Sequence, residues 1–260
     1  MNWLFIVSIT LYFLGLVSYL LHLAFRNNLM FILATATISV GFLVETFALV
    51  QISLQTGHGP YTSPFEYCVF SAWTIIAVFL VAEGYYKIKP LGVFMVPIAL
   101  LMMLIAFSLP SDPNPMLPVK EYWLTLHRTM SFMSFATFAM IFASGVMYLI
   151  LEKQLKSKHL GGWYYRLPSL DAIDDINRKG IVFGFPVSTL AVAAAFVWSI
   201  KNYGVVINLE LSVAILLVGW LVYAILGLGR LAFGWRGKRT ATLGIVGFLI
   251  LSTALIVHIH

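Results

Sequence analysis

Histidine and tryptophan are the residues of this sequence best suited to bind a ring that carries a metal. His127 lies four residues after Trp123 near the start of one apolar segment, and His258 lies at the end of the last one. Positions four apart share a helix face, so the Trp123 indole could wall a slot beside His127. Two neutral imidazoles can supply both axial nitrogens of a haem in such a slot. His127 and His258 are therefore the candidate metal ligands.

These residues also have ordinary interpretations, which stay open. A histidine near a helix end is most often solvated, and tryptophan is common in the aromatic belts of membrane proteins. His58, His127, His258 and His260 fall on one side of the predicted topology given below, whereas His22 and His159 fall near the other. His58 is retained as a further candidate for cofactor binding.

The acidic residues of interest are two glutamates. Glu45 lies within the apolar stretch VGFLVETFALV, residues 40–50. An ionisable group at that depth costs about 2–3 kcal/mol to insert and is normally turned toward the protein with a partner. We expect Glu45 to face the interior near the third and sixth apolar segments, either as a packing residue or as a cofactor-binding residue. Glu66 follows SPF and is expected to complement the amino end of a helix.

The sequence lacks the motifs of several other kinds of functional site. Cys68 is the sole cysteine, so the chain has no internal disulfide and no CxxC pair. HExxH and glycine-rich phosphate-binding patterns are also missing. The sequence therefore predicts neither a hydrolase nor an ATPase, and no catalytic residue is proposed.

The elements that must position these residues are apolar helices. Hydrophobic residues make up 61% of the 260 positions and charged residues only 10%, which is typical of an integral membrane protein. Continuous apolar runs favour helices over a barrel. The sequence predicts an all-α, polytopic membrane helix bundle, in one domain over 1–260, with eight transmembrane helices. Their spans are 2–24, 30–53, 66–85, 90–109, 122–151, 178–200, 208–229 and 240–259.

Basic residues predict the orientation. Thirteen of the sixteen Lys and Arg lie in alternate connections, and only Lys120, Arg128 and Lys201 lie on the other side. By the positive-inside rule both termini face outward, in a bacterial plasma (inner) membrane. The first span is expected to be retained, since it lacks signal-peptide features. Anionic lipid accounts for the net charge of +6, so we expect the lipid bilayer and no nucleic acid as a partner.

Three connections carry polar residues. QTGHGPYTSPFEY, residues 55–67, is predicted to be an outer loop that folds back over the bundle, and the proline-rich 110–123 is a second outer loop. On the cytoplasmic side Ser169 can cap a short helix with an apolar stripe beside Asp171, Asp174 and Asp175. The stripe either lies on the membrane surface or contacts a partner protein. Its apolar residues are Leu170, Ile173 and Ile176.

Three passages carry a resemblance to a known family. GHGPYTSPFEYCVFSAW (57–73), YWLTLHRTMSFMSFA (122–136) and LPSLDAIDDINRKGIVFGFPVSTL (167–190) occur in this order. They resemble the patterns GH.P...YES..F..W, W...H....Y..F and LP.L..LD..N......GFP.LT of cytochrome c assembly membrane proteins of the CcsA type. The resemblance covers about residues 40–200.

The resemblance implies an outward-facing haem flanked by two histidines, which correspond to His127 and His258. Family members also hold haem in a tryptophan-rich WG..W.WD loop. This chain instead has Trp198 followed by SIKNYGVVINLE, and Glu45 stands where the family has a histidine in its second helix.

The shortened loop is similar to the HemX-like branch, which is associated with tetrapyrrole synthesis. Two hypotheses follow. In the first, the chain is a haem-binding or haem-handling protein, at most a component of a haem-delivery or cytochrome c ligation system, with a cytochrome c assembly protein as partner. In the second, it is a regulatory scaffold that contacts glutamyl-tRNA reductase and binds no haem.

Overall fold

All regular structure is helical in the computed structural model of the chain, which describes residues 3–111, 122–158, 161, 164–205 and 210–259. The all-α prediction is confirmed. The predicted features at Lys120, His159 and His260, and most of the proline-rich connection, lie outside these residues. The eight helices in the described part are α1 Trp3–Phe25, α2 Asn28–Thr56, α3 Pro64–Tyr86, α4 Leu91–Ala106, α5 Tyr122–Ser157, α6 Leu170–Tyr203, α7 Leu211–Phe233 and α8 Lys238–Ile259.

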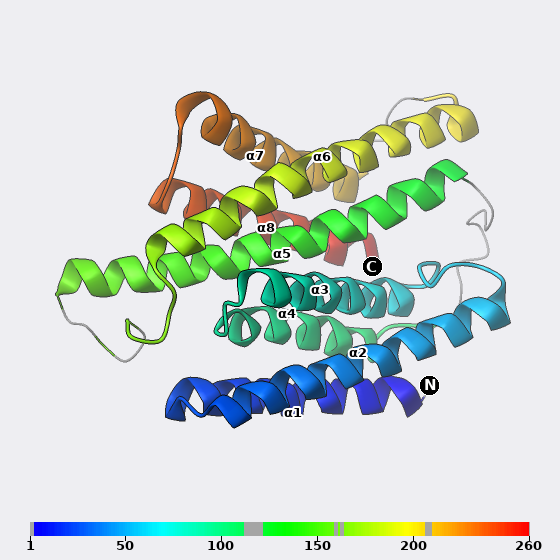
Figure 1. Cartoon of the computed structure of the whole chain (residues 1–260). Coiled ribbons are helices and arrows are strands. Elements are labelled where there is room, and N and C mark those ends of the chain that lie inside the picture. Colours follow the sequence, from blue (N-terminus) through cyan, green and yellow to red (C-terminus); the bar gives the residue numbers. More distant parts are fainter. Residues whose placement is uncertain (1–2, 112–121, 159–160, 162–163, 206–209, 260) are drawn as a thin grey trace. The chain divides into compact units, whose positions relative to one another are not determined.

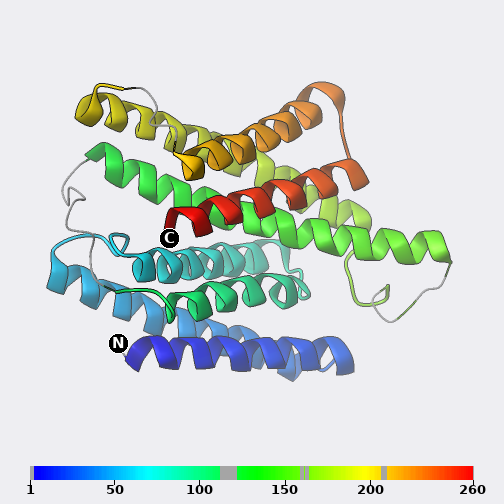
Figure 2. The same cartoon turned by 180° about the vertical axis from the view of Figure 1, so that it is seen from behind.

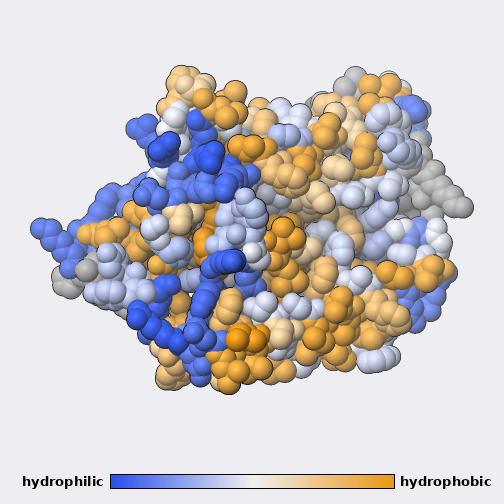
Figure 3. All heavy atoms as spheres, viewed as in Figure 1, coloured by the Kyte–Doolittle hydropathy of each residue, from blue (hydrophilic) through white to orange (hydrophobic). Residues whose placement is uncertain are grey.

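Seven of these helices are long and apolar enough to cross a membrane. The exception is α4, which has 16 residues and contains Pro97. Large apolar side chains are exposed along the helices, for example Leu43 at 65% and Leu231 at 80%. Figure 3 shows apolar residues over much of the visible surface, which is the surface expected of a protein in lipid.

The helices divide into two compact units, residues 1–120 with α1 to α4 and residues 121–260 with α5 to α8 (Figures 1 and 2). Within unit 1, α1 packs on α2 and α4, and α3 packs on α2 and α4. Within unit 2, α5 packs on α6 and α8, and α7 packs on the same two helices. Each unit is therefore a closed arrangement of four helices, and the one-domain expectation stays a prediction.

Glycine allows the α5–α6 pair of unit 2 to approach closely. A Cβ atom at Gly184 of α6 would lie 3.0 Å from both Phe138 Cε1 and Thr137 Cγ2 of α5. The Gly180 position, one turn earlier, would meet Ile141 in the same way.

The start of α6 differs from the sequence-based expectation. The side chain of Ser169 does cap a helix, because it accepts a hydrogen bond from the Ala172 backbone N–H at 3.3 Å. The helix is α6 itself, which continues for 34 residues to Tyr203. Ile173 and Ile176 are 1% and 0% exposed, so this stripe packs inside unit 2. The prediction of a separate short helix was wrong, since helix periodicity continues without a break into the apolar span.

Candidate functional site

His127 is held by a main-chain contact between α5 and α6. Its Nδ1 lies 2.8 Å from the carbonyl oxygen of Ala191, which is buried in the middle of α6. A carbonyl oxygen can only accept, so Nδ1 carries the proton in this bond. Nε2 makes no hydrogen bond within the described part of the chain. A neutral His127 therefore has its lone pair on Nε2, the arrangement that a metal-binding histidine needs.

His258 lies in the last turn of α8, on a helix that packs against α5. A Cβ atom at Gly145 would lie 2.9 Å from the Ala241 carbonyl, and the rings of Phe135 and Phe248 are 5.1 Å apart. These contacts define an antiparallel register between α5 and α8. Continued toward the start of α5, the register leads to the last turns of α8. His127 and His258 are close enough to interact electrostatically.

Trp123 lies one turn before His127 and lines a cavity of about 150 Å³ between α5 and α6. The cavity is apolar and open on one side, where Leu190 is 59% exposed. The ammonium group of Lys201 lies 5.8 Å from the centre of the Trp123 ring. The other lining residues are Leu126, Met130, Ala193, Ala194 and Val197. Neither His127 nor His258 lines this groove, so this end of unit 2 has two histidines and, separately, an apolar groove beside Trp123.

Glu45 belongs to unit 1 and is fully buried. The Tyr12 hydroxyl of α1 donates a hydrogen bond to Glu45 Oε2 at 2.6 Å, while Oε1 has no partner among the described residues. The expectation of an interior position with a polar partner is confirmed. The partner comes from α1, which hydropathy did not indicate, and the expected location of Glu45 near the third and sixth helices stays a prediction.

His58 also belongs to unit 1, in the connection between α2 and α3. Its Nδ1 lies 2.9 Å from the Gly59 carbonyl, and the Thr62 hydroxyl lies 3.4 Å from the ring. Ser63 and Glu66 form a capping box at the start of α3, so the predicted capping role of Glu66 is confirmed. The backbone N–H of Phe65 donates to the Pro110 carbonyl at 3.3 Å. This connection therefore packs on its own unit instead of extending into solvent.

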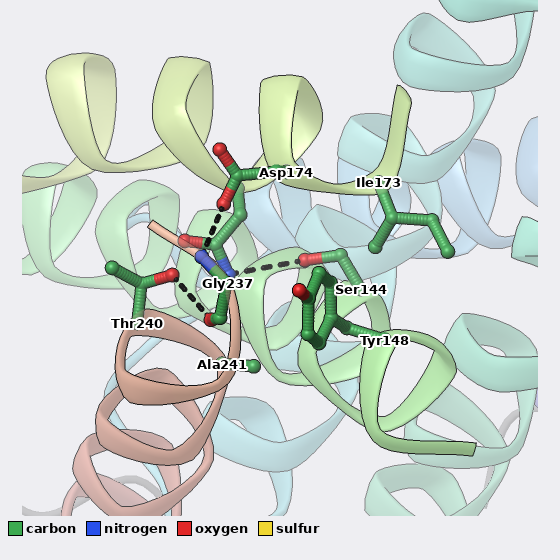
Figure 4. Close-up of a pocket in the computed structure, with 8 residues that line it drawn as sticks. Ser144, Tyr148, Ile173, Asp174, Gly237, Thr240 and Ala241 are labelled. Atoms are coloured by element: carbon green, nitrogen blue, oxygen red, sulfur yellow. Dashed lines mark hydrogen bonds between the residues drawn. The ribbon is translucent and has the colours of Figure 1, made fainter. Parts of the chain in front are cut away.

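A cluster of polar side chains lies at the other end of unit 2, and the sequence analysis did not predict that these residues come together. Arg230 of α7 and Asp174 of α6 form an ion pair with a nitrogen–oxygen distance of 2.7 Å, and the Arg230 side chain is only 5% exposed. Asp174 also accepts a hydrogen bond from the Gly237 backbone N–H. Figure 4 shows Asp174 and Gly237 in one pocket with Tyr148. The nearby Asn177 amide donates to Ser144. The quoted family pattern contains an aspartate and an asparagine at the positions of Asp174 and Asn177, and that signal could have revealed the cluster.

Two further residues near the start of α5 and the end of α6 were also missed. Arg128 is only 7% exposed although it follows His127 directly. Trp198 Nε1 is buried and has no hydrogen-bond partner in the part of the chain that the structure describes. Within those residues no group of three or more His, Cys, Asp or Glu side chains could hold a metal ion. Any metal at this end would therefore need ligands beyond such a group, as the iron of a haem has.

Comparisons with known proteins indicate the family of the chain. The sequence profile described as Cytochrome C assembly protein matches residues 4–258. The cytochrome c biogenesis protein CcsA of Guillardia theta is 26% identical over 259 residues, which covers 91% of this chain and 86% of that protein. The proteins of the same name from Chlamydomonas reinhardtii and Rippkaea orientalis are 29% and 25% identical. They are matched over 57% and 82% of their own lengths, and over 75% and 84% of this chain.

Proposed function

The chain belongs to the cytochrome c assembly protein family, and from this premise we propose that it binds haem at the outer end of unit 2. His127 and His258 are the residues that would hold its iron, and the indole of Trp123 would lie against the ring. The role is haem binding or handling in cytochrome c biogenesis, the process named for its relatives.

The observation that carries the proposal is the bond between His127 Nδ1 and the Ala191 carbonyl. Histidines that bind metals usually donate their second ring N–H to a carboxylate or a backbone carbonyl, which fixes the ring and increases the basicity of the binding nitrogen. His127 has this arrangement, with Nε2 available for the iron. An ordinary solvated histidine would not need a partner in the buried backbone of a second helix.

The residues present fit a haem in their chemistry. Haem supplies an iron that binds two imidazole nitrogens and can change oxidation state. The apolar groove beside Trp123 suits the flat ring, although its volume of about 150 Å³ is below the ~300–1,000 Å³ of typical closed ligand sites. We therefore expect the groove to cover part of the ring while lipid or a partner protein covers the rest.

The connection between α6 and α7 limits what this site can do next. Tyr203 ends α6 and Leu211 begins α7, which leaves no room for the tryptophan-rich loop of the family resemblance. We propose that the chain holds or passes on haem and leaves its attachment to a cytochrome to another protein. The HemX-like branch, with glutamyl-tRNA reductase as partner and without bound haem, is the alternative that this short connection favours.

A cofactor-binding role for two residues of unit 1 stays a prediction. Glu45 and His58 both have local partners, Tyr12 and Thr62. The proposed setting is the bacterial plasma membrane with both termini outside. Termini on one side need an even number of crossings, so this proposal counts the shorter helix α4 as a crossing beside the seven candidate spans. Cysteine labelling of the two ends in intact cells and in inverted vesicles tests that orientation.

An absorption spectrum tests the function. Protein purified from haem-replete cells should have the spectrum of a six-coordinate, low-spin haem, and both His127→Ala and His258→Ala should lose it. His22→Ala is the control, since His22 lies at the end of α1 in unit 1 and its ring contacts the backbone of Asn27. His260→Ala should also keep the spectrum. A parent protein that binds no haem after supplementation would overturn the proposal and leave the scaffold alternative.

A further inference from the structure

The apolar groove of unit 2 follows the seam between α5 and α6. Its lining residues extend from Trp123 to Met130 on α5 and from Leu190 to Val197 on α6. Seven residues of helix correspond to a rise of about 10 Å, so the groove follows the helix axes over about that length. Both helices are long and apolar enough to cross a membrane. The groove therefore runs in the direction in which the acyl chains of lipids extend.

The groove opens toward the apolar surface of these helices. Two of its lining residues, Leu190 and Ala193, are exposed, and all of its lining residues are apolar or aromatic. Apolar spaces of this kind do not hold water, and an empty space would lose the dispersion contacts of its walls. In a membrane the neighbouring material is lipid. A lipid chain is therefore the occupant that the lining of the groove favours.

A cation lies at one end of the groove. Lys201 is in the last turn of α6, and its ammonium group lies 5.8 Å from the centre of the Trp123 ring, which lines the groove. Lys201 is exposed, and Trp123 is in the first turn of α5. Tryptophan and lysine near helix ends are typical of the headgroup level of a membrane. The phosphate groups of lipids lie at that level, so a lipid whose chain enters the groove brings its phosphate toward Lys201.

We propose that in the haem-free chain this groove holds one acyl chain of an anionic phospholipid, and that Lys201 binds the headgroup of that lipid. The volume of about 150 Å³ is too small for a whole lipid, so the groove takes part of one chain and the rest stays in the bilayer. The chain itself gives little preference, because bulk lipid is as apolar as the groove. The headgroup therefore makes the selection. The inference does not depend on the proposed haem binding.

The charge of Lys201 sets the size of the expected preference. A basic residue near a membrane surface attracts anionic lipid by about 1 kcal/mol, which corresponds to about fivefold in binding. If Lys201 only extends to the headgroup level for its own solvation, any phospholipid would fill the groove equally well. A comparison of anionic and zwitterionic lipids with the same chains separates these two roles.

The experiment uses the full, haem-depleted chain in bilayers that contain a photoactivatable phosphatidylglycerol or phosphatidylcholine with the same labelled chain. Mass spectrometry locates the cross-links. The parent should show cross-links within 123–130 and 190–197, at about fivefold higher yield with phosphatidylglycerol. Lys201→Gln should bring the two yields together, whereas Lys201→Arg should keep the preference. Lys89→Gln is the matched control, because Lys89 also lies over an aromatic ring, that of Phe31, but in unit 1.

A second variant tests the groove itself. Ala193→Phe adds a ring at an exposed lining position and should lower the cross-links within both segments for both lipids. Leu228→Phe is its control, since Leu228 is 61% exposed on α7 and does not line the groove.

Equal yields of the two lipids in the parent would overturn the role of Lys201 and leave ordinary contact with the bilayer. Cross-links that stay unchanged in Ala193→Phe, or that are missing from both segments of the parent, would overturn occupation of the groove. If Ala193→Phe does not fold, the parent and Lys201→Gln still decide, because the exposed Lys201 is not part of the buried packing of unit 2. Failure of the haem spectrum would leave all of these outcomes unaffected, so the two proposals fail separately.

Discussion

At the scale of single residues, the Tyr12–Glu45 pair of unit 1 shows how a buried polar side chain is stabilised between apolar helices. Both residues are 0% exposed, and their hydrogen bond of 2.6 Å joins α1 to α2. Gly41 lies one turn from Glu45, where an added Cβ atom would lie 2.9 Å from the Tyr12 ring. The glycine therefore makes room for the tyrosine that the glutamate needs.

Replacement of Glu45 should depend strongly on the new side chain. Glu45→Gln keeps an acceptor for the Tyr12 hydroxyl, so we expect a loss of less than about 1 kcal/mol in stability. Glu45→Leu leaves that hydroxyl buried without its acceptor and should cost about 1–3 kcal/mol. Thermal unfolding in detergent measures both.

Tyr12→Phe is the matched second change. In the Glu45→Leu background it removes the orphaned hydroxyl, so the double variant should be more stable than Glu45→Leu alone. Simple addition of the two losses would show that the pair contributes little through its hydrogen bond.

At the scale of helices, the contact between α5 and α6 determines where His127 lies. Gly180 and Gly184 let the two backbones approach, and His127 then reaches the Ala191 carbonyl further along α6. The glycines are about two to three helical turns from Ala191. A change in the helix spacing at Gly184 should therefore reach the proposed ligand.

Gly184→Ala should destabilise unit 2 by about 1–3 kcal/mol, because its Cβ atom would press on Phe138 and Thr137 at 3.0 Å. It should also weaken haem binding without touching the histidines. Gly84→Ala in α3 is the control, since nothing lies within 4 Å of a Cβ atom there. That change should be neutral or stabilise the helix by up to about 1 kcal/mol. Equal effects of the two substitutions on unfolding temperature would contradict this account.

At the scale of the whole molecule, contacts between distant segments hold each unit together, and the Asp174–Arg230 pair is the clearest of these. It joins the start of α6 to the end of α7, and Asp174 also binds the backbone of Gly237 before α8. Both charged side chains are largely buried, at 5% exposed for Arg230 and 17% for Asp174. Loss of one partner would leave a charge without compensation.

Arg230→Gln should therefore cost about 3–5 kcal/mol, the usual effect of breaking a buried pair. Arg178→Gln is a matched control, because Arg178 pairs with Asp175 on the same helix but is 57% exposed. Its loss should cost less than about 1 kcal/mol. Proteolysis at the α7–α8 connection, or unfolding in detergent, compares the two, and similar losses would contradict a special role for Asp174.

The sequence predicted the bounds of the helices well, but it did not predict which helices pack against each other. Apolar runs gave the helix bounds within a few residues except at the end of α5 and the start of α6, where polar turns continue each helix outside the apolar span. The burial of Glu45 was predictable from its cost in lipid, but its partner Tyr12 was not, because hydropathy carries no information on helix pairing. His127 and His258 were identified from type, spacing and family pattern. The acceptor for His127 is a backbone atom, which leaves no trace in the sequence.

That acceptor has a consequence for how the chain can diverge. Every residue type carries a main-chain carbonyl, so no substitution at Ala191 can delete the group that orients His127. Side-chain volume at position 191 is restricted, since Ala191 is buried, but hydrogen-bonding chemistry there is not. A proposed ligand oriented in this way can keep its tautomer through extensive sequence drift in α6. Relatives that share only a quarter of their residues with this chain could thus retain the same imidazole geometry while the side chains around it change.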